Sequence, residues 1–352
     1  MYERRSCGMQ KKLGFGIIGC GIIADFHANA IYECGNDAEL IGVCDVVFDA
    51  AEKFAHRHGT KAFLNEDALL NCDDIDVVCI CTPSGYHHAS VIAAARAGKH
   101  IICEKPLAIN KEQLDAVEEE CKKAGVTVSV ISQNRYAKSI RRVKSAIDEG
   151  LLGKIVCADI YMKYYRSQEY YDSGSWRGTK RIDGGGALMN QGIHGVDLLL
   201  YLAGDIKSVY AISKTLVRNI EVEDTLSAIV EYKSGATGVI QATTSVYPGY
   251  PRRLDINGEN GSIVLDETSI VRWDIQNGHG HDDVILMPSF THGAATPTAI
   301  SGDGHVQQIS DMIRCIKDGR QPLSGLADGR KAVDVILAIY RSAEEGRPVV
   351  LE

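Results

Sequence analysis

Residues 12–27 read KLGFGIIGCGIIADFH, a short apolar run that breaks at glycines and continues with helical spacing. Gly19 permits a tight turn, Gly21 lets the backbone approach a phosphate, and Ala24 is small enough for close helix–strand packing. The first turn of the following helix offers free N–H groups and the positive end of the helix dipole to an anion. The stretch therefore predicts a strand, a phosphate-binding turn and a helix, as at the start of a dinucleotide-binding domain.

The next apolar run, AELIGVCD at 38–45, ends in an acidic residue. Asp45 lies 26 positions after Gly19 (45 − 19). An acid at the end of the second strand can accept hydrogen bonds from the adenosine ribose and repels a 2′-phosphate, so NAD is predicted and NADP is less favoured. The structural alternative is a glycine-rich turn with a capping Asp45, and the strand–turn–helix context disfavours it.

The first part of the chain continues to alternate strand and helix patterns. The predicted strands are 12–19, 38–45, 75–83, 100–106 and 126–136. The predicted helices are 21–35, 49–59, 87–98 and 111–125. Short apolar strands separated by helices are typical of a parallel sheet covered on both faces. Residues 1–135 are therefore predicted to be a Rossmann domain, and the fold class is α/β.

After residue 135 the pattern changes to longer runs with alternating polarity. These predicted strands are 154–165, 206–217, 225–235, 236–246, 252–266 and 269–276. Helical patterns occupy 138–150, 187–204, 305–318 and 329–346. Alternation of this kind is typical of antiparallel sheets with one covered face. Residues 136–352 are therefore predicted to form an α+β domain with a large, mostly antiparallel open sheet.

Bulk properties restrict the class of protein. The 352 residues exceed what one core usually serves, and the formal net charge of −8 comes without any block of Lys or Arg, so neither nucleic acid nor a membrane is a predicted partner. The N-terminus lacks the apolar region of a signal peptide, and either Met1 or Met9 can be the start. Several of the eleven cysteines lie in apolar runs, as buried thiols of a cytoplasmic protein do.

The run IICEKPLAIN places a charged pair and a proline where an apolar strand stops. Lys105 follows Glu104 at the predicted carboxyl end of the fourth strand. Ligands of doubly wound sheets bind outside the carboxyl ends of the strands. Lys105 is therefore expected to face a ligand rather than to be a solvated loop residue.

The order of motifs along nearly the whole chain resembles the Gfo/Idh/MocA oxidoreductases. The motifs are GFGIIGCGIIADFH, VCD, TPSGYHHASVIAAARAGKHIICEKPLA, QNRY, GSWRG, GGGALMNQGIHGVDLL and GHVQQISDMIRCIKDGRQP. This family includes inositol dehydrogenases, glucose–fructose oxidoreductase and many sugar and nucleotide-sugar dehydrogenases. The resemblance implies a Rossmann domain, a second domain on a large open sheet, and homodimers or homotetramers formed through that sheet.

The resemblance also implies which residues meet the cofactor. Thr82 and Pro83 match the family's Thr-Pro-Asn segment, with Ser84 replacing the commoner Asn, and Glu104-Lys105-Pro106 matches its catalytic motif. The implied cofactor contacts are Gly19, Gly21, Ile22, Ile23, Asp45, Thr82, Pro83, His87, Glu104, Lys105, Asn134, Trp176 and Arg177. His27 and His87 match family positions near the helices of this domain, and we interpret them as mainly structural.

A second motif supplies acid–base chemistry. Asn190 and His194 are four residues apart on a predicted helix, so both can face one way. By resemblance, His194 is the base and Lys105 hydrogen-bonds the reacting hydroxyl, with Asn190 as a third catalytic and substrate contact. Inositol dehydrogenases of the family carry Asp at the position of Asn190, which weakens assignment to that activity. The alternative for His194 is a buried histidine that packs the domain junction.

Three weaker signals concern ligands. Tyr161, with Tyr164 and Tyr165 nearby, is predicted to contact a sugar, although packing between subunits explains such tyrosines equally well. The cluster NGHGHDD at 277–283 has metal-ligand residue types, but its glycines favour a loop, so no metal is predicted. His305 opens a late helix and is expected to cap it or to approach the site.

The resulting hypothesis is an NAD-dependent oxidoreductase acting on a secondary alcohol of a sugar, a polyol or a nucleotide sugar. One alternative is a redox-neutral NAD-dependent glycoside hydrolase, as some relatives are. Another is a non-catalytic NAD-binding regulator. The presence of Lys105 and His194 argues against the regulator.

Overall fold

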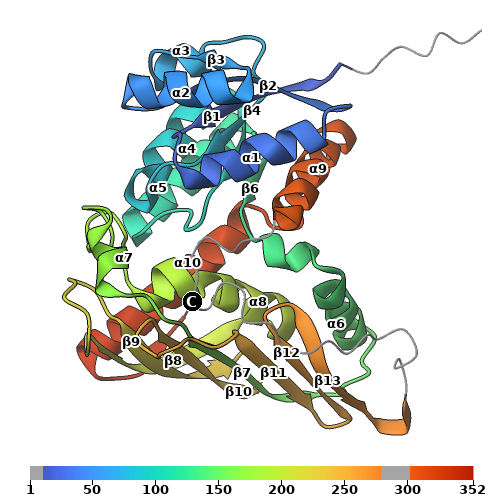
Figure 1. Cartoon of the computed structure of the whole chain (residues 1–352). Coiled ribbons are helices and arrows are strands. Elements are labelled where there is room, and N and C mark those ends of the chain that lie inside the picture. Colours follow the sequence, from blue (N-terminus) through green and yellow to red (C-terminus); the bar gives the residue numbers. More distant parts are fainter. Residues whose placement is uncertain (1–10, 279–301, 352) are drawn as a thin grey trace, which may run out of the picture.

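A computed structural model of the chain describes residues 11–278 and 302–351 (Figure 1). Its N-terminal sheet has six parallel strands in the order β3-β2-β1-β4-β5-β6. The strands are β1 (Leu13–Ile18), β2 (Ala38–Cys44), β3 (Lys61–Ala62), β4 (Val77–Ile80), β5 (His100–Cys103) and β6 (Val128–Val130). This is the Rossmann strand order, which reverses between β1 and β4 and opens a crevice there. The predicted α/β class is confirmed, although β3 was missed because two half-exposed residues leave no apolar run.

Helices cover both faces of this sheet. They are α1 (Ile22–Glu33), α2 (Phe48–His58), α3 (Glu66–Leu70), α4 (His87–Arg96) and α5 (Lys111–Ala124), with a 3₁₀ turn η1 (Ser84–Tyr86) before α4. Strand β4 shows why helices are needed on both faces. Its residues Val77 and Cys79 belong to the core under α1 and α2, and Val78 and Ile80 belong to the core under α4 and α5. Successive side chains of a strand face opposite ways, so four buried residues in a row require two covers.

The C-terminal sheet has eight strands in the order β13-β12-β11-β7-β10-β9-β8-β14. They are β7 (Ile155–Lys163), β8 (Ile206–Lys214), β9 (Thr225–Tyr232), β10 (Thr237–Thr243), β11 (Arg253–Gly258), β12 (Gly261–Asp266), β13 (Ser269–Ile275) and β14 (Val349–Val350). All neighbouring strands are antiparallel except β7 and β10, which confirms the mostly antiparallel prediction.

Helices α8 (Ile193–Ala203) and α10 (Leu326–Glu345) pack on one face of this sheet, the face toward the N-terminal domain in Figure 1. The strands alternate accordingly, as in β9, where Leu226 and Ala228 are buried while Ile229 on the opposite face is exposed. Connecting elements include α6 (Lys138–Asp148), α7 (Gln168–Asp172) and the 3₁₀ turns η2 (Gln133–Tyr136) and η4 (Gln276–Gly278). None of the described helices is long and apolar enough to cross a membrane.

The two sheets are joined by elements that do not follow chain order. Helix α9 (Asp303–Asp318) comes late in the sequence but packs against α1, with Ile309 and Met312 in the core of the N-terminal domain. Arg135, just after β6, is buried and forms a bidentate ion pair with Asp197 of α8 at 2.9 and 2.7 Å, and it also contacts Asp328. The segment after β6 is thereby tied to the second domain, while the boundary at 135/136 stays a prediction.

Candidate functional site

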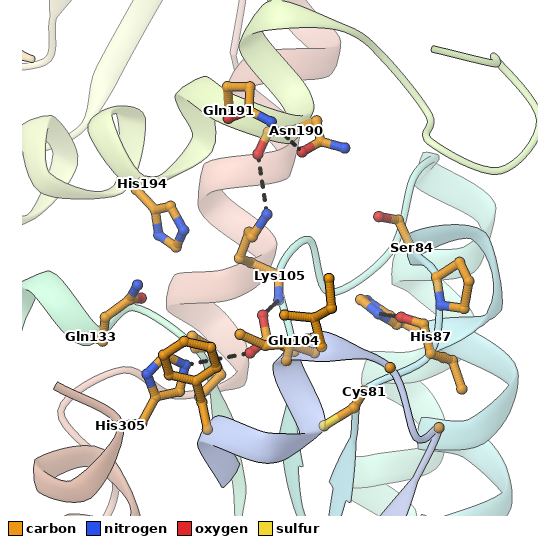
Figure 2. A pocket seen from close by; sticks show the side chains of 18 of the residues that line it. Cys81, Ser84, His87, Glu104, Lys105, Gln133, Asn190, Gln191, His194 and His305 are labelled. Atoms are coloured by element: carbon orange, nitrogen blue, oxygen red, sulfur yellow. Dashed lines mark hydrogen bonds and ion pairs between the residues drawn. The ribbon is translucent and has the colours of Figure 1, made fainter. Parts of the chain in front are cut away.

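A cavity of about 1620 Å³ lies where the carboxyl ends of the parallel strands face the second domain. Its lining comes from the glycine turn, the ends of β2, β4 and β5, the start of α9, and the segment before α8 (Figure 2). Pockets for a single drug-sized ligand have volumes of roughly 300–1,000 Å³. The cavity therefore has room for an extended cofactor and a second molecule beside it.

The glycine turn is shaped to receive a ligand. Gly19 has φ +93°, and a Cβ there would come within 2.9 Å of the backbone of Cys81, so only glycine fits. A Cβ at Gly21 would meet no protein atom within 4 Å, and Gly21, Ile22 and Ile23 all line the cavity. The N-terminus of α1 therefore faces open space, as a pyrophosphate site requires.

Asp45 directly follows β2 and contacts the glycine turn. Its carboxylate accepts hydrogen bonds from the backbone N–H groups of Cys20 at 2.8 Å and Val47 at 2.9 Å. It also lines the cavity, beside the exposed apolar side chains of Val46 and Leu64. Asp45 thus caps the turn and still borders the space where the predicted ribose and adenine would lie.

The ends of β4 and β5 form the middle of the cavity. Thr82, Pro83 and Ser84 line it, and the buried Thr82 Oγ1 has no hydrogen-bond partner among the described residues. Because buried hydroxyl groups are usually hydrogen-bonded, we interpret this one as a group that bonds to a bound cofactor. Asn134 lines the cavity as well, next to Gln133, whose buried Oε1 is likewise unpartnered within the described chain.

His87 is a structural brace at this edge. Its Nδ1 lies 2.6 Å from the carbonyl oxygen of Pro106, and its Nε2 lies 2.7 Å from that of Thr82. Burial lowers the pKa of His87, with the two carbonyls opposing the shift. Since both ring nitrogens are engaged by the protein, His87 ties the two strand ends together and borders the cavity without a free polar atom.

Lys105 extends from the end of β5 across the cavity toward the second domain (Figure 2). Its Nζ donates to the carbonyl oxygen of Asn190 at 3.1 Å. Burial lowers the pKa of Lys105, while the carboxylates of Glu104 and Asp183 oppose that shift and Arg177 adds to it. The side chain of Lys105 therefore borders the cavity and is not a solvated loop residue.

His194 faces the same space from the first turn of α8 (Figure 2). Burial lowers the pKa of His194 to about 3, and the charges of Lys105 and Arg252 contribute in the same direction. The imidazole is therefore neutral near pH 7 and can accept a proton. Since the ring borders the cavity, it is not enclosed in the packing between the domains.

Asn190 does not stand on the same α-helix as His194. Residues Ala187–Gly192 form a π-helical turn (η3), and α8 begins at Ile193. The wider turn still brings Asn190 and His194 to one side, and such π turns are often found at functional sites. The side-chain amide of Asn190 is engaged by the protein, because Nδ2 donates to Asp183 and Oδ1 accepts from Gln191 at 3.0 Å.

Three arginines line the part of the cavity nearest the second domain, which we call the substrate half. Two of these arginines were not predicted. Arg166 and Arg252 are 5% and 3% exposed and line the cavity with Arg177. Arg177 donates to the hydroxyl of Tyr170 at 2.7 Å, and its guanidinium stacks over the Trp176 ring at 4.4 Å. Arg166 and Arg252 stand in separate strand-end segments without a motif, so only the fold brings them together.

The prediction for Tyr161 is wrong in its geometry. Side chains alternate along β7, and Tyr161 lies on the same face as its cross-strand partner Arg253, away from the helices and outside the cavity lining. Tyr164, just after the end of β7, is 7% exposed and lines the cavity instead. The period of the strand could have shown that residues 161 and 164 face opposite ways.

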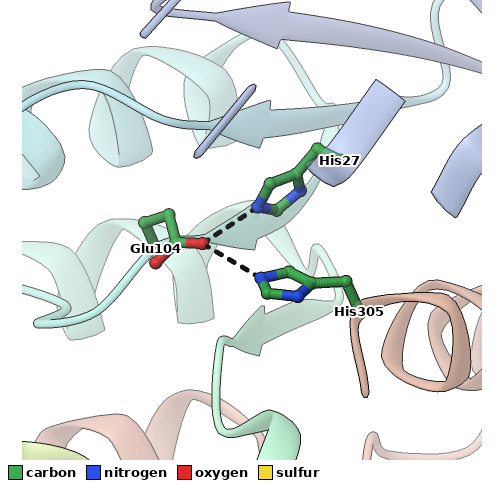
Figure 3. Close-up of side chains that lie close together, drawn as sticks. All are labelled: His27, Glu104 and His305. Carbon is green, nitrogen blue, oxygen red and sulfur yellow. Dashed lines mark hydrogen bonds and ion pairs between the residues drawn. The ribbon is translucent and has the colours of Figure 1, made fainter. Parts of the chain in front are cut away.

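His27, Glu104 and His305 form a buried cluster (Figure 3), with ligand-type atoms all within 4.8 Å of one another. His27 Nε2 lies 3.0 Å from Glu104 Oε1, and His305 Nε2 lies 3.6 Å from the same oxygen. Burial alone would raise the pKa of Glu104, but His27 and His305 outweigh it and hold that pKa well below its ordinary value.

The donor set of this cluster resembles a metal site, but its surroundings do not. A metal-bound histidine usually donates its other ring N–H to an acceptor. In the described part of the chain, Nδ1 of His27 and Nδ1 of His305 both lack such a partner. We therefore interpret the two imidazoles as holding Glu104 ionised and fastening α9 to the cofactor domain. The other candidate cluster, at 277–283, falls largely outside the described residues.

The fold and the cavity together define a class. An anion-binding turn lies at the switch point of a Rossmann sheet, and a lysine and a neutral histidine meet across the adjoining space from two domains. This arrangement is typical of dinucleotide-dependent oxidoreductases.

Comparison with known proteins identifies the family within that class. A family model described as "Oxidoreductase family, NAD-binding Rossmann fold" matches residues 13–132, and one described as "GFO/IDH/MocA C-terminal domain" matches residues 140–264. The chain belongs to this GFO/IDH/MocA oxidoreductase family, which confirms the resemblance seen in its motifs. Its N-terminal domain is an NAD-binding Rossmann domain.

Individual relatives span almost the whole chain. The crystal structure of the WlbA dehydrogenase from Bordetella pertussis, in complex with NADH and UDP-GlcNAcA, is 34% identical with a TM-score of 0.88 and covers 97% of this chain and 99% of its own. Levoglucosan dehydrogenase in complex with NADH and levoglucosan is 26% identical with a TM-score of 0.86, covering 97% and 99%. Myo-inositol 2-dehydrogenase of Thermotoga maritima is 29% identical, covering 96% and 98%.

Proposed function

We propose that the protein is an NAD-dependent dehydrogenase that oxidises a secondary alcohol of a sugar. The observation that carries this proposal is the meeting of Lys105 and His194 in one cavity beside the glycine turn. The two side chains come from different domains, so a substrate that touches both must lie at the junction. Named relatives of the chain are dehydrogenases of CH–OH groups.

In this mechanism each residue has one task. Lys105 donates a hydrogen bond to the reacting hydroxyl oxygen and stabilises the negative charge that develops there. His194 accepts the O–H proton as the C–H bond breaks and the C=O bond forms. Gly19, Gly21 and Asp45 would hold NAD, which would supply the hydride acceptor for the carbinol carbon. The neutral state of His194 is the form that can take a proton, and developing alkoxide charge nearby raises its basicity.

The residues present fit the cofactor. Gly19 and Gly21 leave space for the pyrophosphate, Asp45 borders the ribose position, and the unpartnered Thr82 hydroxyl lies farther along the same wall. We propose that Trp176 and Arg177, which line the cavity, contact the cofactor, as the motif resemblance implies.

We further propose that the sugar carries an acidic group. Arg166 and Arg252 are buried cations in the substrate half. Arg252 pairs with Glu267 at 3.3 Å through one terminal nitrogen, while its Nε has no hydrogen-bond partner among the described residues. Buried guanidinium groups are suited to carboxylate and phosphate. UDP-GlcNAcA, bound in the WlbA structure, is such a molecule. A neutral polyol such as myo-inositol is the second candidate, supported by a 29% identical relative but weakened by Asn190.

A matched panel of substrates tests both parts of the proposal. The protein is incubated with NAD or NADP and with UDP-GlcNAcA, UDP-GlcNAc, myo-inositol or levoglucosan, and NADH formation is followed by its absorbance. Faster turnover of UDP-GlcNAcA than of UDP-GlcNAc supports the acidic-sugar proposal, and the reverse order contradicts it. Turnover of myo-inositol alone favours a polyol dehydrogenase.

The two alternative functions predict other outcomes. Release of a glycosidic leaving group without net NADH points to a redox-neutral glycoside hydrolase. Tight NAD binding with neither activity points to a regulator. Both outcomes remain compatible with the family and the fold, so this assay separates functions rather than folds.

We also propose that the protein forms a homodimer or homotetramer through the open face of the C-terminal sheet. Tyr210 and Ile212 of β8 and Ile229 of β9 are exposed there, which is costly for a face in water. Light scattering of the intact protein against an Ile229→Lys variant tests this, since a buried lysine disrupts the association. A monomeric parent protein contradicts the proposal. The cytoplasmic location stays a prediction.

A further inference from the structure

Asp183 was not predicted as a site residue, yet it lies next to the centre of the proposed site. It directly precedes the glycines at 184–186 and is 2% exposed. One carboxylate oxygen accepts the N–H of Gly178 at 2.8 Å, and the other accepts the side-chain N–H of Asn190. Burial raises the pKa of Asp183, and these hydrogen bonds, together with Lys105 and Arg177, oppose the shift.

Asn190 connects Asp183 to Lys105. The Lys105 ammonium donates to the backbone carbonyl of Asn190, while the side chain of that same residue donates to Asp183. The contacts therefore run from the Asp183 carboxylate through Asn190 to the Lys105 ammonium. Asn190, a residue of the π turn, makes both of them. A shift of Asn190 would move the acceptor of Lys105.

A buried ammonium also needs negative charge nearby. The charged and titratable groups that act on Lys105 or face it are Glu104, Asp183, Arg177, His194 and His87. Glu104 is already engaged, because Oε1 contacts His27 and His305 and Oε2 accepts the backbone N–H of Lys105. Among the residues that the structure describes, the side-chain hydrogen-bond partner of Asp183 is the uncharged amide of Asn190, so its charge is not neutralised by a direct ion pair.

We propose that Asp183 is a positioning residue that acts through Asn190 to hold the Lys105 ammonium in place and in its charged form. This role rests on the proposed function, since Lys105 must donate to the reacting hydroxyl for it to matter in turnover. Asp183 does not line the cavity, so it does not act by touching the substrate.

The test exchanges the two members of the pair. Asp183→Asn keeps a hydrogen-bonding amide but removes the charge, and the double variant Asp183→Asn with Asn190→Asp returns the charge to the same contact with reversed hydrogen-bond direction. Asp172→Asn is the matched control, because Asp172 is an exposed carboxylate on the nearby helix α7.

The readout is the titration of Lys105, measured by the pH dependence of its acetylation with acetic anhydride and mass spectrometry. Loss of a neighbouring negative charge lowers an amine pKa, so Asp183→Asn shifts the midpoint down by roughly one pH unit, and the double variant and the Asp172→Asn control titrate like the parent. The pH limb on which kcat/KM falls at high pH moves in the same way. An unchanged acetylation midpoint in Asp183→Asn overturns the proposal.

The acetylation measurement does not require turnover, so it separates this inference from the proposed function. If Asp183→Asn shows the expected shift of the Lys105 midpoint but the parent protein has no dehydrogenase activity, the role of Asp183 is supported and the proposed function is contradicted. A double variant that stays folded, as thermal unfolding shows, but keeps the lowered midpoint identifies a packing role for Asp183 and contradicts the proposal.

Discussion

The two halves of the cavity are built by different means. The cofactor half consists of backbone and small residues of consecutive elements: the turn at Gly19 and Gly21, the end of β2 at Asp45, and the end of β4 at Thr82. The substrate half consists of charged and polar side chains from distant segments, among them the half-buried Lys105 and the buried Arg166 and Arg252. A cofactor shared by a family demands a local motif, whereas a substrate is recognised by charges that only the tertiary structure assembles.

The largest effect is expected where the two halves meet. Lys105→Ala should lower kcat by about 1,000-fold, because it removes the donor to the reacting oxygen, while NAD affinity changes little. Turnover assays and calorimetric titration of NAD measure the two quantities. Lys111→Ala, on the exposed start of α5, is the control. Near-normal turnover of Lys105→Ala would remove it from the mechanism.

The cofactor half alone is tested by Asp45→Ser. Removing the carboxylate should lower the ratio of kcat/KM with NAD to that with NADP by about 10- to 100-fold, because the repulsion of a 2′-phosphate is lost. Asp49→Ser, an exposed acid in the first turn of α2, should leave the ratio unchanged. If Asp45→Ser retains the parent ratio, NAD preference comes from another residue.

The substrate half is tested by Arg252→Gln. We expect KM for an acidic sugar to rise by about 10-fold, with little change for a neutral sugar, because one charge-assisted contact is lost. Arg253→Gln is a matched control, since Arg253 is the adjacent residue, half-exposed and paired with Asp255 outside the cavity. An equal effect on acidic and neutral sugars would mean that Arg252 only supports the fold.

The smallest effect is on stability in acid. The folded protein holds the pKa of His194 at about 3, below its unfolded value of about 6.5, so the unfolded chain binds a proton first as pH falls. The contribution of His194 to the free energy of unfolding is therefore fully present above about pH 6.5. It falls by on the order of a few kcal/mol as the pH decreases toward 3. His194→Gln should therefore flatten the decline of Tm between pH 7 and 4. An equally steep decline in the variant would assign acid sensitivity elsewhere.

Sequence patterns predicted most of the fold because its signals are local. Apolar strands between helices indicated a parallel sheet, and alternation after residue 135 indicated the antiparallel one. Strand β3 was missed because it has two residues and no apolar run. The π turn at Ala187–Gly192 was missed because its sequence has ordinary helical spacing, and its hydrogen bonds depend on Tyr340 and Glu223 of other elements.

The sequence by itself determined the cofactor half. Glycine spacing and an acid at a strand end are constraints of backbone geometry, and these act between residues close in the chain. Only the tertiary structure decided the substrate half: that Tyr164 rather than Tyr161 faces the cavity, that Arg166 and Arg252 converge on it, and that Asp183 contacts Asn190. Buried charges are tolerated where partners from other elements compensate them, and no local pattern records which partners those are.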